Sequence, residues 1–338
     1  MRILQPKVEV WIPAEDPKDW KDHVARCARV CYASDKTSGN EELVARLDRE
    51  QHISMMRHRS MYWALPVDSV KWPGLMVISK HNPFIRVLRE GQDGIGDVVF
   101  VSTNGHYWYD HSDELIELGF TEENQVPHNV MAQTPGRAIM RYTVFLRTQI
   151  STSRELNRVS PNNISEQSTR FCNYTKGKFG GHPAICAPWW FELHQCNGLG
   201  IDDAIIIESD PYVQGSIIMK DGDWDRINKA YAYQFLEEHG PSLATAMLEI
   251  YLHGCCRDME DYIELVNRGM KPQDARGKLP IDTCTEVVYT YFWDEWERLF
   301  ENRVEGKRGV PHPNARKIME MVKSSIEELY DNELSSVR

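Results

Sequence analysis

The stretch NRVSPNNISEQSTRFCNY, residues 157–174, gathers polar and charged side chains on one short segment. It contains two arginines, one acid and four serine or threonine hydroxyls, and almost nothing apolar before Phe171. A core helix or strand needs an apolar face that recurs at helical or alternating spacing, and this stretch has neither. Its composition instead indicates a segment that holds Arg158, Glu166, Ser168 and Arg170 close together around a polar partner.

The sequence on either side of this stretch predicts an α+β fold. Strands are predicted in KVEVWIP (7–13), MVIS (76–79), VVFVSTNGHYWY (98–109) and RAIMRYTVFLRTQ (137–149). Helices are predicted over 16–34, 40–50 and 151–159, and from about 224 to 266. Strands and helices alternate after that point. We therefore expect one domain over residues 1–338, with a surface insertion between residues 69 and 135.

Composition and charge limit the possible functions. With 338 residues, 41% of them hydrophobic, the chain can bury a sizeable core. No apolar run approaches the roughly 18 residues that a membrane helix needs, and the N-terminus lacks the pattern of a signal peptide, so a cytoplasmic protein is expected. The formal net charge of −11 disfavours a wide nucleic-acid surface. A small anionic ligand held by a local arginine cluster remains compatible with this charge.

Several standard binding devices are absent from the sequence. No G-x-G-x-x-G follows a predicted strand, and each Gly-Lys pair lacks the Ser or Thr of a phosphate-binding loop, so side chains must hold any nucleotide. The eight cysteines contain no C-x-x-C pair and are expected to be thiols. We predict no metal site, although His253 lies close to Cys255 and Cys256 in the sequence.

The predicted helix WDEWERLFENR (293–303) places a charge in line with its apolar face. Trp296, Phe300 and Arg303 fall at i, i+4 and i+7, so Arg303 needs a partner in a partly buried place. A structural salt bridge is the usual answer, and an anionic ligand group is the functional one. Arg276, in KPQDARGKLP, presents the same choice.

Several segments resemble one known family in the order in which that family carries them. SRELNRVSPNNISEQSTRFCNYTKGKFG (153–180) resembles the signature region of the flavin-dependent thymidylate synthases, in which Arg-His-Arg precedes a Ser-x-Arg pair and an aromatic residue. HISMMRHRSMYW (52–63) resembles the family's His-x-Ser/Thr element, and VFVSTNGHYW (99–108) resembles a strand of its longer members. KPQDARGKLPIDTCTEVVYT, DEWERLFENR and HPNAR resemble its C-terminal pattern.

This resemblance implies a fold, a reaction and an assembly. The family fold has a central, mostly antiparallel sheet flanked by helices. The family reaction is the reductive methylation of dUMP to dTMP, in which FAD carries hydride from NADPH and methylenetetrahydrofolate supplies the carbon. The resemblance also implies a homotetramer whose active sites are assembled from more than one subunit.

The same resemblance implies roles for individual residues. The residues that would bind dUMP are Glu155, Arg158, Glu166, Gln167, Ser168, Thr169, Arg170, Arg276 and Arg303. Arg303 would be the catalytic residue, because a fixed cation facing the uracil ring favours loss of the N3 proton and makes C5 a better nucleophile. The residues that would contact FAD or the folate are His52, Ser54, Arg158, Val159, Ser160, Glu166, Phe292 and Arg298.

The chain departs from the family pattern at the flavin. Arg158-Val159-Ser160 stands where the family has Arg-His-Arg, which removes an imidazole and a cation. Phe292 replaces an asparagine of shorter members. Arg298 stands where relatives have Asn or His, and we hypothesise that it restores the lost positive charge. An intact Arg-His-Arg at 57–59 belongs to the other element, where only His58 matches a family histidine.

Alternative functions follow from these departures. A changed flavin pocket that admits water would leave a hydroxymethyl group on the pyrimidine instead of a methyl group. A flavin-free nucleotide-binding or scaffold protein would keep the dUMP cradle without redox chemistry. The purely structural alternatives are a hydrophilic surface loop at 157–174, and a helix-end histidine with a capping serine at His52 and Ser54.

Overall fold

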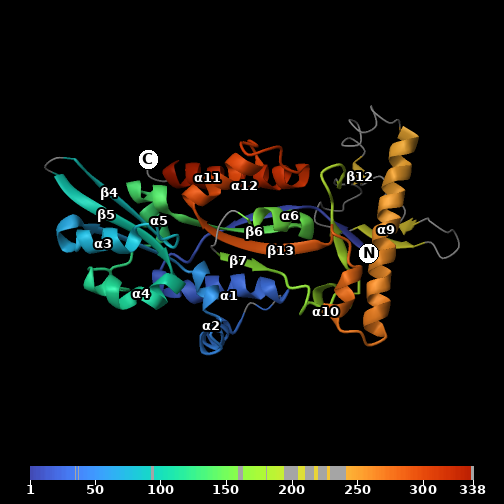
Figure 1. The fold of residues 1–338 in the computed structure, drawn as a ribbon, viewed down its shortest axis with the longest axis horizontal. Coiled ribbons are helices and arrows are strands. Elements are labelled where there is room, and N and C mark those ends of the chain that lie inside the picture. The colour runs from blue at the N-terminus through green and yellow to red at the C-terminus, as the bar shows by residue number, and fades with distance from the viewer. Residues whose placement is uncertain are drawn as a thin grey trace.

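A four-stranded sheet in the order β2–β6–β13–β7 runs through the middle of the computed structural model (Figure 1). Its strands are β2 (Lys7–Trp11), β6 (Arg141–Gln149), β7 (Asn163–Glu166) and β13 (Cys284–Phe292). All three pairings are antiparallel, and β6 and β13 pair along their full nine-residue lengths. The prediction of an α+β fold built on an antiparallel sheet is confirmed.

The structure describes residues 1–34, 36, 38–92, 95–158, 163–179, 181–193, 205–209, 217–219, 227–228 and 241–335. Val159 and Ser160, two of the predicted flavin contacts, lie outside these residues.

Helices cover both faces of the central sheet (Figure 1). One face packs against α6 (Ile150–Leu156), α11 (Trp293–Arg303) and α12 (Pro313–Ser335). The other face packs against α1 (Trp20–Cys31), which lies beside α2 (Asn40–Arg49). Side chains of β6 alternate between the two layers: Val144 joins the core under α12, and Phe145 joins Val30 of α1. Because both faces are buried, the apolar residues Val144, Phe145 and Leu146 follow one another in β6 instead of alternating with polar ones.

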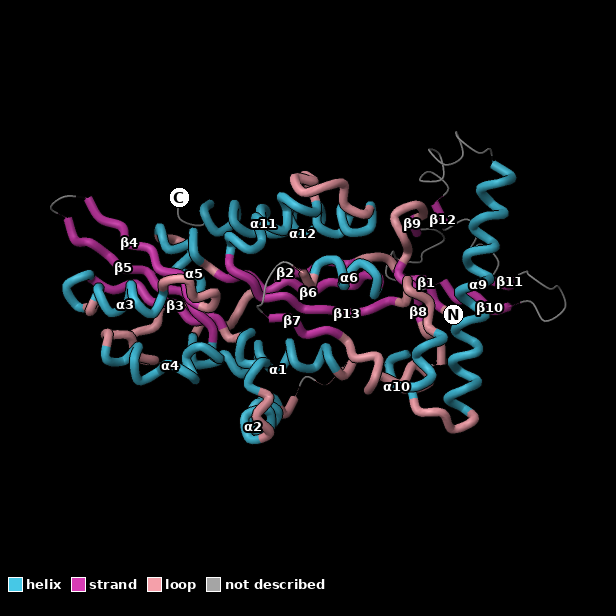
Figure 2. The backbone as a smooth tube through the Cα atoms, in the orientation of Figure 1, coloured by secondary structure: helices cyan, strands magenta, loops and turns pink. Residues whose placement is uncertain are grey.

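A second antiparallel sheet forms one end of the molecule (Figure 2). Its order is β3 (Ser60–Pro66), β5 (Ile95–Asn104), β4 (Ile85–Gln92), and it packs with α3 (Trp72–Ser79) and α4 (Gly105–Glu117). A short helix, α5 (His128–Ala132), follows. This region has its own core of buried residues. The predicted insertion between residues 69 and 135 falls largely in this region, and its status as an insertion stays a prediction.

One strand prediction in this region was wrong, and a second was correct to residue 104 and wrong beyond it. MVIS (76–79) forms the end of α3, with Met76 and Val77 exposed, because a short apolar run does not distinguish a helix from a strand. The strand predicted over residues 98–109 ends at Asn104, where the side chain accepts a hydrogen bond from the backbone N–H of Tyr107 at 2.9 Å. This N-cap starts α4 inside the segment that alternation favoured as strand.

The opposite end carries α9 (Pro241–Asn267) against a sheet in the order β11–β10–β1–β8 (Figure 1). The strands are β1 (Arg2–Leu4), β8 (Ala184–Cys186), β10 (Ile205–Ser209) and β11 (Ile217–Met219), and β9 (Glu192–Leu193) pairs with β12 (Ile227–Asn228). The helix predicted from about residue 224 was wrong at β12, and residues 229–240 lie outside the described part. Among the described helices, none is long and apolar enough to cross a membrane.

Buried histidines tie the central sheet to the segments around it. His58, which is fully buried, hydrogen-bonds Thr290 Oγ1 of β13 and Ser165 Oγ of β7, both at 2.8 Å. His23 of α1 hydrogen-bonds Thr143 Oγ1 at 3.0 Å. Burial lowers the pKa of His58 well below its usual value and lowers the pKa of His23 to about 3. Both imidazoles are therefore neutral parts of the core.

We expect the stability to fall on acidification because of these histidines. Below about pH 6.5 the unfolded chain protonates them while the folded chain does not, so each lowers the free energy of unfolding by up to about 1.4 kcal/mol per pH unit. For His23 this loss continues down to its folded pKa of about 3. Urea unfolding at pH 7, 6 and 5 measures how the free energy of unfolding changes with pH. In His23→Gln this change should be about 1 kcal/mol per pH unit smaller than in the wild type. A slope equal to that of the control His52→Gln, at an exposed position, would contradict this expectation.

Candidate functional site

Glu166 ends β7 with its carboxylate fixed by three donors. Ser153 Oγ donates to Oε1 at 2.7 Å, Thr285 Oγ1 donates to Oε1 at 3.2 Å, and Asn157 Nδ2 donates to Oε2 at 3.4 Å. Asn157 is itself fixed, because its Oδ1 accepts from the hydroxyl of Tyr289 at 2.7 Å. An ionised carboxylate has about four lone-pair sites, so Glu166 keeps capacity to accept from a ligand N–H or O–H group.

Arg303 lies at the end of α11, next to the same short helix α6. Its Nη2 donates to the backbone oxygen of Glu155 at 2.9 Å, and its Nε lies 4.0 Å from Glu155 Oε2. This Nε is buried and has no hydrogen-bond partner among the described residues. The side chain is 21% exposed. The prediction that Arg303 finds a partner beside the apolar face is confirmed, and that partner is largely a neutral carbonyl.

The residues after β7 form an exposed polar turn. The N–H of Gln167 donates to the backbone oxygen of Glu286 at 2.8 Å, and the N–H of Ser168 donates to that of Cys31 at 2.9 Å. Ser168 Oγ accepts from the backbone N–H of Arg170 at 3.2 Å. Gln167 is buried and its Nε2 donates to the Tyr174 hydroxyl at 3.1 Å, so it joins the turn to the core.

Arg276 meets this turn from another part of the chain. It opens the 3-10 turn η6 (Arg276–Lys278), which follows α10 (Pro272–Ala275). Its Nη1 donates to Thr169 Oγ1 at 3.1 Å. Arg170 and Arg276 are both exposed, and Arg170 lies over the ring of Phe171 with Cζ 5.3 Å from the centroid. Two exposed guanidinium groups, one on this turn and one that contacts it from η6, provide donors of the kind that a phosphate dianion needs.

The structure thus arranges the predicted dUMP residues in two groups. One group, around α6, contains Glu155, Glu166 and Arg303. The other, on the exposed turn, contains Ser168, Thr169, Arg170 and Arg276. Glu166 and Ser168 are two residues apart, which corresponds to roughly 7 Å along an extended chain. Arg158 is exposed just beyond the end of α6.

The predicted flavin or folate contacts in the described part of the chain come from separate elements. His52 and Ser54 are exposed at the start of the 3-10 helix η2 (Ile53–His58). Arg298 is half exposed on α11, 3.9 Å from Asp294. These polar side chains and Arg158 are accessible to a cofactor. Phe292 is fully buried under the guanidinium groups of Arg86 and Arg141, 4.4 and 5.3 Å from its centroid, and presents no surface.

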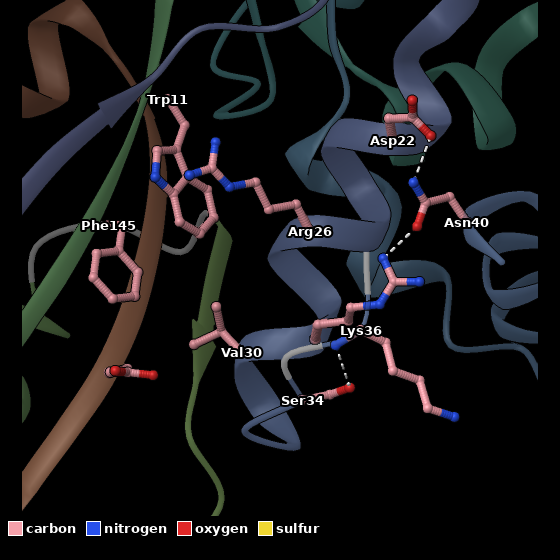
Figure 3. A pocket seen from close by; sticks show the side chains of 10 residues that line it. Trp11, Asp22, Arg26, Val30, Ser34, Lys36, Asn40 and Phe145 are labelled. Atoms are coloured by element: carbon pink, nitrogen blue, oxygen red, sulfur yellow. Dashed lines mark hydrogen bonds between the residues drawn. The ribbon is translucent and has the colours of Figure 1, made fainter. Parts of the chain in front are cut away.

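A cleft of about 460 Å³ beside α1 contains none of the predicted residues (Figure 3). Its aromatic wall is a stacked pair, Trp11 and Phe145, with centroids 5.2 Å apart, and Arg26 lies 3.7 Å over Trp11. Arg29 donates to Asn40, which in turn donates to Asp22 at 2.7 Å (Figure 3). The arginines of this cleft are therefore engaged within the protein.

Sequence reasoning missed the residues that position Glu166. Ser153 and Asn157 stand four apart within the quoted signature region, which a helix places on one face, so their shared role had a readable signal. Thr285 had none, because only the pairing of β7 with β13 brings it to Glu166.

Comparison with known proteins gives one family match and distant structural similarities. A family model described as thymidylate synthase complementing protein matches residues 130–330, more than half of the chain. No curated protein matches it. Two solved structures, of a UMP/dUMP methylase PolB from Streptomyces cacaoi bound with 5-Br dUMP or 5-Br UMP, are 14% identical with a TM-score of 0.37. They cover 99% of this chain, which covers 97% and 96% of theirs. The family match contains every predicted site residue except His52 and Ser54.

Proposed function

Because the chain belongs to the thymidylate synthase complementing protein family, the family of the flavin-dependent thymidylate synthases, we propose that it methylates dUMP reductively to dTMP. The observation that carries this proposal is the pairing of a fixed carboxylate with an exposed cationic turn. Glu166 is held by three donors, Arg170 lies on the turn that begins just after it, and Arg276 of η6 donates to Thr169 of that turn. A nucleotide needs both features, one for its hydroxyl or amide groups and one for its phosphate.

The turn would bind the phosphate of dUMP. Arg170 and Arg276 supply guanidinium donors, and Ser168 and Thr169 supply hydroxyl donors on shorter side chains. Glu166 would accept a hydrogen bond from the nucleoside. Because its carboxylate is already oriented by the protein, little reorganisation is needed when the nucleotide binds.

Arg303 would act on the uracil ring. Its buried Nε has no hydrogen-bond partner among the described residues, although Glu155 Oε2 lies 4.0 Å away, and Nη2 donates to a neutral backbone oxygen. The Nε–H is therefore available to a ligand. A cation fixed against the pyrimidine stabilises the negative charge that develops when N3 loses its proton, and the electron-rich ring then attacks through C5. None of the eight cysteines is assigned as a nucleophile.

FAD, when bound, would supply the hydride taken from NADPH, while methylenetetrahydrofolate would supply the carbon. The exposed polar side chains His52, Ser54, Arg158 and Arg298 fit a flavin dinucleotide, which carries a diphosphate and a polar ring system. Phe292 does not fit a direct contact, since its ring is covered.

The active site would be shared between subunits of a homotetramer. In one chain Arg303 contacts Glu155 while Arg276 contacts Thr169, so the two arginines belong to separate groups. Co-expression of two inactive variants, Arg303→Ala and Arg276→Ala, should restore about one quarter of wild-type activity, because random assembly pairs two intact arginines at about one site in four. Activity no higher than that of the single variants would place each site within one chain.

The visible spectrum of the purified protein tests the proposed chemistry. A near-stoichiometric flavin band, reduced by NADPH and reoxidised only when dUMP and methylenetetrahydrofolate are present, is expected, with dTMP as the product. A product 16 mass units heavier than dTMP would show that the enzyme hydroxymethylates dUMP instead of methylating it. A colourless protein that binds dUMP and takes up no FAD would overturn the enzyme assignment.

Arg298→Ala should lower the flavin content and the affinity for added FAD by about tenfold, if Arg298 replaces the positive charge missing at Ser160. The fold should not change, because this side chain is half exposed and its contact with Asp294 is long. Flavin content equal to that of the wild type would refute the compensating role. Lys323→Ala, on α12, is a matched control at a cationic side chain outside every predicted site.

A further inference from the structure

A cleft of about 390 Å³ lies where the second sheet region meets η2. It is lined by Arg57 of η2, by the turn that joins α3 to β4, including Lys80, and by the first turn of α4, including Asn104 and His106. None of the predicted site residues lines it. Its volume is within the range of ligand pockets, about 300–1,000 Å³.

Arg57 and the neutral His106 form one wall of this cleft, and Arg57 gives it a positive charge. Arg57 Nε donates to His106 Nδ1 at 2.8 Å, so the proton of the neutral imidazole is on Nε2, which lies 3.4 Å from Asp110 Oδ2. Burial and the Arg57 charge lower the pKa of His106, which favours this neutral form. The guanidinium group also lies over Phe84, with Cζ 5.1 Å from the ring centroid.

The first turn of α4 is pinned beside Arg57. The N–H of Gly105 donates to the backbone oxygen of Arg59 at 3.0 Å, and a Cβ at Gly105 would lie 2.8 Å from the backbone oxygen of Met56. Only glycine permits this close approach. The first turn of α4, a helix that kinks at His111, is therefore held in place at this part of the molecule.

The cleft is also lined by a buried donor that has no partner among the described residues. Asn104 is fully buried and lines the cleft, and its Oδ1 caps α4. Its Nδ2 has no hydrogen-bond partner among the described residues. A buried donor left unpaired costs about 1–3 kcal/mol, so a ligand acceptor at this point would be favoured.

The charges that face the cleft are mixed, with cations in excess. Arg57 and the exposed Lys80 are positive, and Asp110 is negative and half exposed. The other titratable side chains that line the cleft are His81, His106, Tyr107 and His111. His111 is 3.1 Å from Glu114. The excess of positive charge is local, because the whole chain has a formal net charge of −11.

From these observations we propose that the cleft binds a phosphate ester of about nucleotide size, with the phosphate between Arg57, Lys80 and the start of α4. Guanidinium and ammonium groups are donors that phosphate prefers, and the Asn104 amide adds a neutral donor. The volume exceeds that of phosphate alone, which leaves room for the organic part of the ligand. This site is separate from the proposed dUMP turn and does not depend on the proposed reaction.

Calorimetric titration with inorganic pyrophosphate, and then AMP, tests this site. Lys80→Gln and Arg57→Gln should each weaken one class of pyrophosphate site by about tenfold. Lys71→Gln, an exposed lysine at the other end of α3, should leave it unchanged, as should Arg276→Ala on the dUMP turn. AMP should bind this class more tightly than pyrophosphate does, because its nucleoside occupies the remaining volume.

Two results would overturn the proposal. One is the absence of any binding of pyrophosphate or AMP to the wild-type chain. The other is binding that Arg276→Ala abolishes and that Lys80→Gln and Arg57→Gln leave unaltered. Thermal unfolding of each variant checks folding, and Lys80→Gln is the decisive one because that side chain is exposed.

Discussion

Arg303→Ala should lower kcat by about 10²–10³-fold while the chain stays folded. Removal of one fixed group that stabilises developing negative charge typically has an effect of this size. Little stability should be lost, because Arg303 donates mainly to one backbone oxygen, that of Glu155, and remains partly exposed. Steady-state assays of dTMP formation with saturating flavin, together with thermal unfolding, measure both effects.

Two further variants make the Arg303 experiment specific. Arg308→Ala removes an exposed cation five residues along the chain and should change kcat by less than about twofold. Arg303→Lys keeps the charge without the planar fork, so it should recover only part of the lost rate. Equal kcat values for Arg303→Ala and Arg308→Ala would remove Arg303 from the catalytic role.

His58→Ala should lower the free energy of unfolding by about 3 kcal/mol. The substitution opens a cavity between β7 and β13 and removes the hydrogen bonds to Thr290 and Ser165. Equilibrium unfolding in urea at pH 7 measures the change. His58→Asn retains one donor and one acceptor and should lose less.

His52→Ala provides the comparison for His58. Its side chain is exposed six residues earlier, so the free energy of unfolding should change by no more than about 0.5 kcal/mol. If His58→Ala were as stable as His52→Ala, the two hydrogen bonds and the packing around His58 would contribute nothing measurable.

Sequence analysis was most successful where periodicity is sustained. The spacing of Trp296, Phe300 and Arg303 predicted a helix with a charge at the edge of its apolar face, and both aromatic side chains are buried beside a partly buried Arg303. The end of α9 at Asn267 was also predicted to within one residue, at about residue 266, since Gly269 and Pro272 follow it. These features depend on local sequence alone.

It failed where a single side chain or a tertiary contact decides the structure. Alternation continued through GHYWY, but the side chain of Asn104 caps a helix there, a signal that the sequence contained. The anchoring of Glu166 by Thr285 depends on strands that are more than a hundred residues apart in the sequence. Phe292 matched a family position by order along the chain, and only packing shows that Arg86 and Arg141 cover it.

Strand β13 has a consequence for how the chain tolerates insertions and deletions. On one side of the sheet, Thr285 donates to Glu166 and Tyr289 donates to Asn157. On the other side, Thr290 hydrogen-bonds the buried His58. Loss of one residue early in this strand would exchange the two sides, because side chains alternate with a period of two. The carboxylate anchor and the imidazole contact would then fail together. The register of β13 thus links the polar site to the stability of the core.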